Sequence, residues 1–199
     1  MRRQWRWLWG LAVAVAIAIT INAPIPQGQL SSSQLGPSAV QAQTSPTTEA
    51  LPLAETPYRD PENRFAVGII EGFQVNTIAN APVIEAADGS LAYTVVVRPS
   101  LADMPLSNAA LAQAARETFQ QGEGFRIQGF QALPSGELRM TWTGQLTTSG
   151  PSQPLSGVIL AQQQENQIFL TLIAATEAAR SEIPGAIATI TSSLEFSPE

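Results

Sequence analysis

A long stretch with few large apolar side chains divides this chain into parts that cannot share one core. Residues 24–57 are mainly Pro, Ser, Thr, Gln and Ala. Such a composition buries too little apolar surface to offset the entropy that ordering costs. We therefore expect folding to be confined to residues 58–199, a length that suffices for one domain with its own core.

The segment before this stretch has the features of an export signal. Residues 8–21 form an uninterrupted apolar run, and Arg2, Arg3 and Arg6 precede it. A positively charged start followed by an apolar run of this length is typical of a secretory signal peptide. The run is shorter than the about 20 residues that a membrane-spanning helix needs. We predict that the protein is exported.

The position at which the signal peptide is cleaved is predicted from the small residues that precede each possible cleavage site. A cut after Ala23 would leave Pro24 as the first residue, which is unfavourable. A cut after Ala42 has Val40 and Ala42 at the two key positions. We predict a signal peptide over residues 1–42 with a long Pro/Ser-rich region before the cut, and a disordered linker over residues 43–57. If the apolar run is retained, this region becomes a membrane tether.

The composition excludes several classes of activity. The chain contains no Cys, His or Lys, and its formal net charge is −6. Serine and cysteine hydrolases that rely on a His base are therefore excluded, as are thiolate metal sites. Nucleic-acid binding needs clustered Arg and Lys, which this acidic chain lacks. We expect no enzymatic activity, no cofactor and no nucleic-acid partner.

The folding part begins with strands. Residues 64–70 alternate large and small side chains and predict a first strand. Residues 83–87 and 91–98 flank Asp88-Gly89, a strong hairpin signal. Four further apolar runs predict an antiparallel meander of strands over residues 125–133, 138–147, 155–163 and 167–175.

Two helices are expected beside these strands. Ser107 is suited to cap a helix over residues 108–121, in which Leu111, Ala115 and Phe119 share one face. Pro184 suits the first turn of a second helix behind Ser181. Its apolar stripe is formed by Ile183, Ile187, Ile190 and Leu194. Grouped strands with segregated helices predict an α+β fold, with a central antiparallel β-sheet flanked by helices.

Few residues are candidates for a site. Glu85 and Asp88, with the Ser90 hydroxyl, could supply oxygen ligands to Ca²⁺, although Asp88-Gly89 can equally be a simple turn. Trp142 is expected in the core rather than in a binding platform, and Glu117 and Glu123 are expected to be solvated. The candidates for binding an anionic partner, which can equally be solvated surface groups, are Arg98, Arg116, Arg126 and Arg139.

The opening of the folding part resembles that of a known family. Residues 58–73 read YRDPENRFAVGIIEGF. A tyrosine, a turn with Asp and Asn, a strand and a Gly before an aromatic are similar to the opening of PsbP-like proteins. The likeness extends over residues 58–196. Ile70 stands where that family often has Pro, and the His residues that bind metal in some members have no counterpart here.

The resemblance implies both a fold and a function. It implies a single PsbP-like α+β domain over residues 58–199, with the sheet between helices as an α/β/α sandwich. It also implies a non-enzymatic accessory protein in the thylakoid lumen or periplasm of an oxygenic phototroph. Such a protein would be membrane-peripheral and would assist the assembly or stability of photosystem II, whose subunits would be its partners.

Two other functions remain open from the sequence. A soluble small-ligand-binding module would hold an apolar or anionic ligand between sheet and helix, with Tyr93 or Arg98 among the polar groups. A carboxylate-dependent hydrolase would need two acids about 5–10 Å apart across a cleft. The placement of these side chains in the structure distinguishes the two.

Overall fold

The computed structural model describes residues 49–100, 104–147 and 152–197. The predicted signal peptide and the first part of the predicted linker lie outside these residues. Within them, no helix has the length and apolar character needed to cross a membrane.

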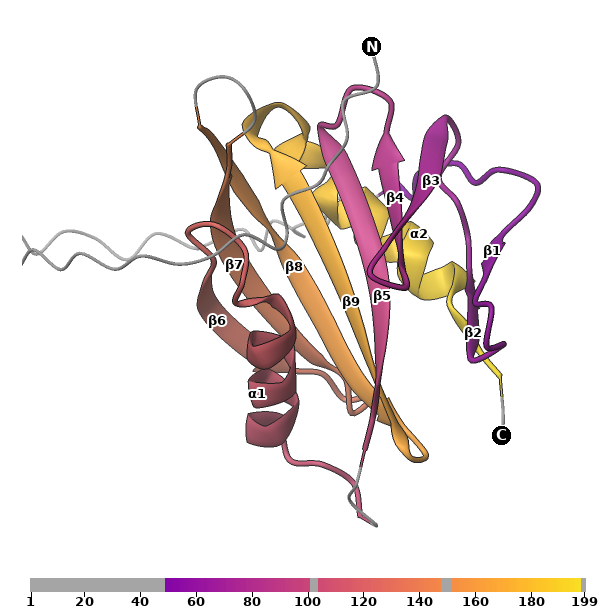
Figure 1. Cartoon of the computed structure of the whole chain (residues 1–199), viewed down its shortest axis with the longest axis vertical. Coiled ribbons are helices and arrows are strands. Elements are labelled where there is room, and N and C mark those ends of the chain that lie inside the picture. The colour runs from indigo at the N-terminus through magenta and orange to yellow at the C-terminus, as the bar shows by residue number, and fades with distance from the viewer. Residues whose placement is uncertain (1–48, 101–103, 148–151, 198–199) are drawn as a thin grey trace, which may run out of the picture. The chain divides into compact units, whose positions relative to one another are not determined.

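A seven-stranded antiparallel sheet forms the centre of the domain (Figure 1). Its strand order is β3-β4-β5-β9-β8-β7-β6. The bounds are β3 Phe73–Ile78, β4 Ala81–Ala86, β5 Leu91–Pro99, β6 Arg126–Ala132, β7 Leu138–Leu146, β8 Gln153–Gln164 and β9 Gln167–Thr176. The predicted meander is confirmed as β6 to β9. The long pairing of β5 with β9, from Leu91↔Ala175 to Pro99↔Gln167, joins it to the first strands.

A small second sheet holds the start of the domain. It consists of β1 (Tyr58–Arg59), β2 (Phe65–Val67) and β10 (Glu195–Phe196), in the order β1-β2-β10. The strand predicted over residues 64–70 is therefore shorter than expected. Beyond β2, Ile70 makes only an isolated bridge with Leu53. β3 was not expected from the sequence; Phe73 and Val75 alternate with Gln74 and Asn76, but the run is short and its side chains are mostly exposed.

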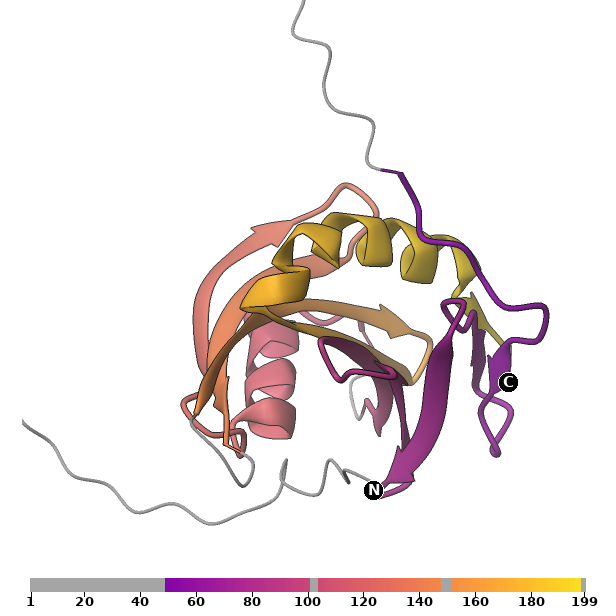
Figure 2. The same cartoon turned by 90° about the horizontal axis from the view of Figure 1, so that it is seen from above.

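The two α-helices lie on opposite faces of the large sheet. Figure 2 shows α2 (Ile183–Ser193) above the sheet and α1 (Asn108–Phe119) below it. The Ser107 side chain accepts a hydrogen bond from the Ala110 amide at 3.3 Å, which confirms the predicted N-cap. Pro184 lies in the first turn of α2, as predicted. Ser181, however, lies in a preceding 3₁₀ helix (Glu177–Glu182), so Glu182 occupies the N-cap position. The α+β class is confirmed.

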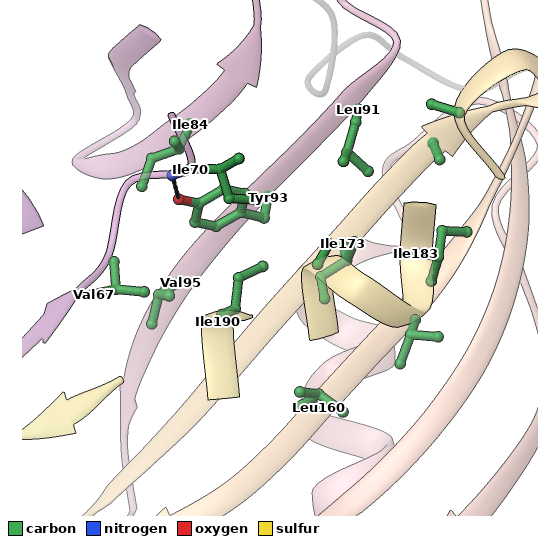
Figure 3. Packing of buried hydrophobic residues seen from close by; sticks show 14 of the residues in the cluster. Val67, Ile70, Ile84, Leu91, Tyr93, Val95, Leu160, Ile173, Ile183 and Ile190 are labelled. Atoms are coloured by element: carbon green, nitrogen blue, oxygen red, sulfur yellow. Dashed lines mark hydrogen bonds between the residues drawn. The ribbon is translucent and has the colours of Figure 1, made fainter. Parts of the chain in front are cut away.

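The core between α2 and the sheet is centred on Tyr93 (Figure 3). The hydroxyl of this buried tyrosine donates to the Gly68 carbonyl at 2.6 Å and accepts from the Ile70 amide at 3.2 Å. Burial raises the pKa of Tyr93 well above its ordinary range, so the hydroxyl stays protonated. The side chain of Tyr93 in β5 thereby holds the residues that follow β2 in place.

Tyr93→Phe is expected to lower the free energy of unfolding by about 1–3 kcal/mol, because it leaves two buried backbone groups without a partner. Urea unfolding followed by circular dichroism measures the change. Tyr58→Phe is the control, because Tyr58 is half-buried and its hydroxyl makes no comparable hydrogen bond within the described residues. It should lower the free energy of unfolding by less. Equal losses in the two variants would contradict the assigned role of the Tyr93 hydroxyl.

Residues 49–54 differ from the disordered linker expected over residues 43–57. The Ala54 amide donates to the Ile69 carbonyl, and the Glu71 amide donates to the Pro52 carbonyl. The Thr189 hydroxyl of α2 donates to the Leu51 carbonyl at 2.9 Å, and the Leu51 side chain packs against the core. The composition of the stretch as a whole concealed this docking, which depends on two apolar residues, Leu51 and Leu53, meeting a site formed by distant elements.

Candidate functional site

An apolar cavity of about 60 Å³ lies on the face of the sheet that carries α1. Successive side chains of a strand point to opposite faces, so Ala92 and Thr94 of β5 face this cavity while Tyr93 points into the core under α2. The other side chains of the wall come from five elements and a loop: Val83, Phe119, Glu123, Phe125, Trp142, Gln145, Leu146, Leu155, Leu172 and Ala174. Small side chains on the central strands leave the space, and aromatic side chains border it.

The loop after α1 closes one side of the cavity. The Gly122 amide donates to the Phe119 carbonyl, and the Phe125 amide donates to the Gly122 carbonyl, so the chain turns tightly. Gly124 has a φ of +63°, which disfavours a residue with a side chain. The Gln145 amide donates to the Glu123 carbonyl at 2.8 Å and ties the loop to β7. The loop therefore has a defined position over the sheet.

Trp142 is the largest side chain in the cavity wall. Its ring lies 5.4 Å from that of Phe125 between centroids. The indole Nε1 donates to the Ile173 carbonyl at 3.2 Å, across the strand position of Gly157. Trp142 is buried in the cluster under α1, which confirms that it is a core residue; it also borders the cavity.

The polar groups of the cavity differ from those expected. Tyr93 points to the other face, and Arg98 donates to the Thr118 hydroxyl of α1 at 3.2 Å outside the cavity wall. Thr94, which the sequence analysis did not single out, lies in the wall and is 6% exposed. Its hydroxyl has no hydrogen-bond partner in the described part of the chain. A threonine within a β-branched run carries no sequence signal for such a role.

The candidate calcium ligands are engaged locally. The Asp88 side chain accepts from the Ser90 amide at 2.9 Å within the hairpin turn. Glu85 accepts from the Asn76 side chain at 2.8 Å, and burial raises its pKa against the opposing effect of that hydrogen bond. Within the described residues, no three acidic side chains come together in a way that could hold a metal ion.

The four candidate arginines do not share one face. Arg116 lies on α1, and Arg98 bonds to that helix. Arg126 pairs with Thr143, and Arg139 pairs with Leu160, whose side chain belongs to the core on the α2 side. Alternation along the strands therefore places Arg126 and Arg139 on the opposite face of the sheet from Arg98.

Two acidic side chains near the start of the domain bind the same arginine. Asp60 and Glu62 both bind Arg64, at 2.7 and 3.2 Å. Beside this ion pair lies a second hollow of about 230 Å³ whose wall includes Asn80. Glu117 accepts from Gln113 on the exposed side of α1. Asp60, Glu62 and Glu117 therefore do not form a general acid and base pair that face each other across a cleft.

One edge of the large sheet carries an exposed aromatic side chain. The outermost strand β6 pairs only with β7, and its register shifts at Ile127/Gly129. Phe130, just beyond this bulge, is 73% exposed. Within the described residues, the outer edge of β6 therefore has no strand partner and lies next to a large apolar side chain.

Comparison with known proteins bears on the fold. No protein-family model matches the chain, and neither does any curated protein sequence. The solution structure of cyanobacterial PsbP (CyanoP) from Synechocystis sp. PCC 6803 matches with a TM-score of 0.50 at 10% identity, over 71% of this chain and 92% of that chain. This chain has a PsbP-like fold. The Ran-binding protein Mog1p of Saccharomyces cerevisiae also matches, with a TM-score of 0.50 at 7% identity, over 72% of this chain and 96% of that chain.

The likeness confirms the fold that residues 58–73 imply. Those residues form β1, the turn held by Asp60 and Arg64, and β2. At such low identities the shared property is the path of the chain, and function has to be argued from the sites themselves.

Proposed function

We propose that this chain is an exported accessory protein without catalytic activity, and that it works by docking onto a protein partner in photosystem II. The observation that carries the proposal is the PsbP-like fold over 71% of the chain. The likeness of residues 58–73 to PsbP-like proteins points in the same direction. The apolar run at residues 8–21 supports export, and the absence of Cys, His and Lys from the sequence fits a role without catalysis.

The outer edge of β6 is the surface best suited to this docking. An unpaired strand edge accepts an extended segment of another protein through backbone hydrogen bonds. Phe130 supplies an apolar anchor there, and aromatic anchors often dominate the affinity of an interface. Arg126 on the same strand is exposed and adds a positive charge for an acidic partner.

Docking is tested by capture on membranes enriched in photosystem II. The tagged full chain is expected to bring down photosystem II subunits in a fixed ratio. Phe130→Ser should weaken this capture by about tenfold or more, the loss typical of an interface anchor. The matched control is Met104→Ser, which removes an equally exposed apolar side chain outside any strand (74% against 73% exposed).

Two outcomes would contradict the proposal. Failure of the full chain to retain photosystem II subunits would remove the proposed partner. Equal capture by the wild type and Phe130→Ser would remove the proposed surface while leaving the partner in place.

A further inference from the structure

We propose that the cavity under α1 binds a small uncharged molecule with an apolar body and one hydrogen-bonding group, such as a hydroxyl or carbonyl. This activity is separate from partner docking, because the cavity lies between β4, β5, β9, β8 and β7, away from the outer edge of β6. Three properties of the wall carry the inference: its apolar lining, the unpartnered hydroxyl of Thr94 and the sign of the nearby charge.

The lining favours an apolar body. Phe119, Phe125 and Trp142 border the space, and aliphatic side chains of the central strands form its floor. Ligand sites are typically concave and mainly apolar, with few polar groups that orient the ligand. Its volume of about 60 Å³ is below the about 150 Å³ of a closed cavity that holds benzene, but this cavity is open on one side, so it suits a short chain or a ring that lies partly outside it.

Thr94 supplies the orienting group. Its hydroxyl is buried and has no hydrogen-bond partner within the described residues. A buried hydroxyl in that state destabilises a fold, and valine would fill the same volume without this cost. A ligand that offers a hydrogen bond to Thr94 restores the missing partner. The other buried polar side chains at the wall are already satisfied. Trp142 Nε1 donates to the Ile173 carbonyl, and the Tyr93 hydroxyl is bonded to Gly68 and Ile70 on the opposite face.

The nearby charge argues against an anionic ligand. Glu123, which is exposed, borders the cavity, and none of the arginines in the described residues does. Arg98, the cation expected at such a site, is bonded to Thr118 instead. A carboxylate or phosphate would enter beside a negative side chain without a compensating cation, whereas a neutral molecule would meet no such penalty.

The test uses Trp142 as the reporter. The other tryptophans are Trp5, Trp7 and Trp9, so a full chain with these three replaced by Phe reports from the cavity wall alone. The probes are benzyl alcohol, toluene and benzoate, which share a ring and differ in the group attached. Benzyl alcohol and toluene should change the emission of Trp142 saturably, and benzoate should bind at least about tenfold more weakly than benzyl alcohol.

Substitution of Thr94 separates a binding site from a packing defect. Thr94→Val should weaken benzyl alcohol about tenfold relative to toluene, because only the alcohol bonds to the hydroxyl. The same variant without ligand should unfold about 2–4 °C higher. Thr141→Val is the matched control, since Thr141 is an exposed strand threonine outside the cavity wall, and it should change neither quantity.

The proposal is overturned if no uncharged probe binds, if benzoate binds as well as benzyl alcohol, or if Thr94→Val weakens toluene and benzyl alcohol equally. Ala92→Ile, which extends a side chain of the cavity wall, gives a second check. It should abolish binding of both uncharged probes, and full binding by a folded Ala92→Ile protein would place the probes elsewhere.

Discussion

Gly157→Ala is expected to destabilise the domain more than Tyr93→Phe or Asp60→Asn. A Cβ at this position would collide with the carbonyl oxygen of Ile173 and lie 2.8 Å from Nε1 of Trp142. Gly157 belongs to β8, which is paired on both sides, so its backbone cannot retreat without breaking a ladder. The Trp142 indole occupies the space above Gly157 and would have to leave its buried hydrogen bond.

The expected loss is at least about 3 kcal/mol, the upper range for an overpacked core site together with a lost buried hydrogen bond. Urea unfolding followed by Trp142 fluorescence, in the chain with the other tryptophans replaced by Phe, measures it. Gly129→Ala is the matched control, because its Cβ would meet only the Thr141 hydroxyl at 3.7 Å. That variant should stay within about 1 kcal/mol of the wild type. Wild-type stability in Gly157→Ala would mean that Trp142 does not lie across this glycine.

Asp60→Asn is expected to cost about 3 kcal/mol of stability, the lower end of the range for breaking a buried ion pair. The Asp60 side chain is 1% exposed. It accepts from the Arg64 guanidinium at 2.7 and 2.8 Å and from the Arg64 amide at 3.2 Å. Neutralising it leaves a partly buried guanidinium without its main partner, in the turn that joins β1 to β2.

Glu62→Gln provides the matched control for this ion pair. Glu62 binds the same guanidinium at 3.2 Å, but its side chain is 71% exposed. Exposed ion pairs contribute about 0–1 kcal/mol. A loss in Glu62→Gln as large as that in Asp60→Asn would contradict the dominant role assigned to burial of Asp60.

The Asp60 ion pair also makes a prediction for pH. Burial opposes ionisation of Asp60, but the hydrogen bonds and charge of Arg64 outweigh it and hold the pKa of Asp60 below its ordinary value. The folded state therefore binds this proton less readily than the unfolded state. The resulting stability is present above the ordinary pKa of an aspartate and is lost as the pH falls through the lowered pKa.

Unfolding free energies measured from neutral to strongly acidic pH test this dependence. The difference between the wild type and Asp60→Asn should be largest near neutrality and should shrink in acid. Glu137, whose pKa is raised by burial against the effect of Arg139, titrates in both proteins and cancels in the difference. A difference independent of pH would mean that the charge of Asp60 does not stabilise the fold.

Local chemistry was sufficient to predict several elements from the sequence. Asp88-Gly89 makes the predicted turn because Gly89 adopts a φ of +72° and Asp88 binds the Ser90 amide. Ser107 caps α1 because its side chain needs only the amide three residues ahead. The strands of the meander were predictable because their apolar runs are bounded by turn residues, such as Glu165 with its positive φ.

Elements that depend on distant partners were not predictable in this way. Residues 49–54 have the composition of a linker, yet they dock because Ile69 and Thr189 offer hydrogen-bond partners. The contact of Thr189 with Leu51 joins residues far apart in the chain, and no local pattern encodes it. β3, in contrast, was missed although its partner is local, because its side chains are mostly exposed and the Ala79-Asn80 turn to β4 was not recognised.

The candidate site shows the same division. From the sequence alone followed an α+β domain, the core position of Trp142 and the lack of His and Cys chemistry, because composition and periodicity determine them. Only the tertiary structure decided that Arg98 and Arg139 lie on opposite faces, that Tyr93 points away from the cavity and that Thr94 points toward it. The physical reason is that strand register assigns each side chain to a face, and register is set by the pairing of whole strands.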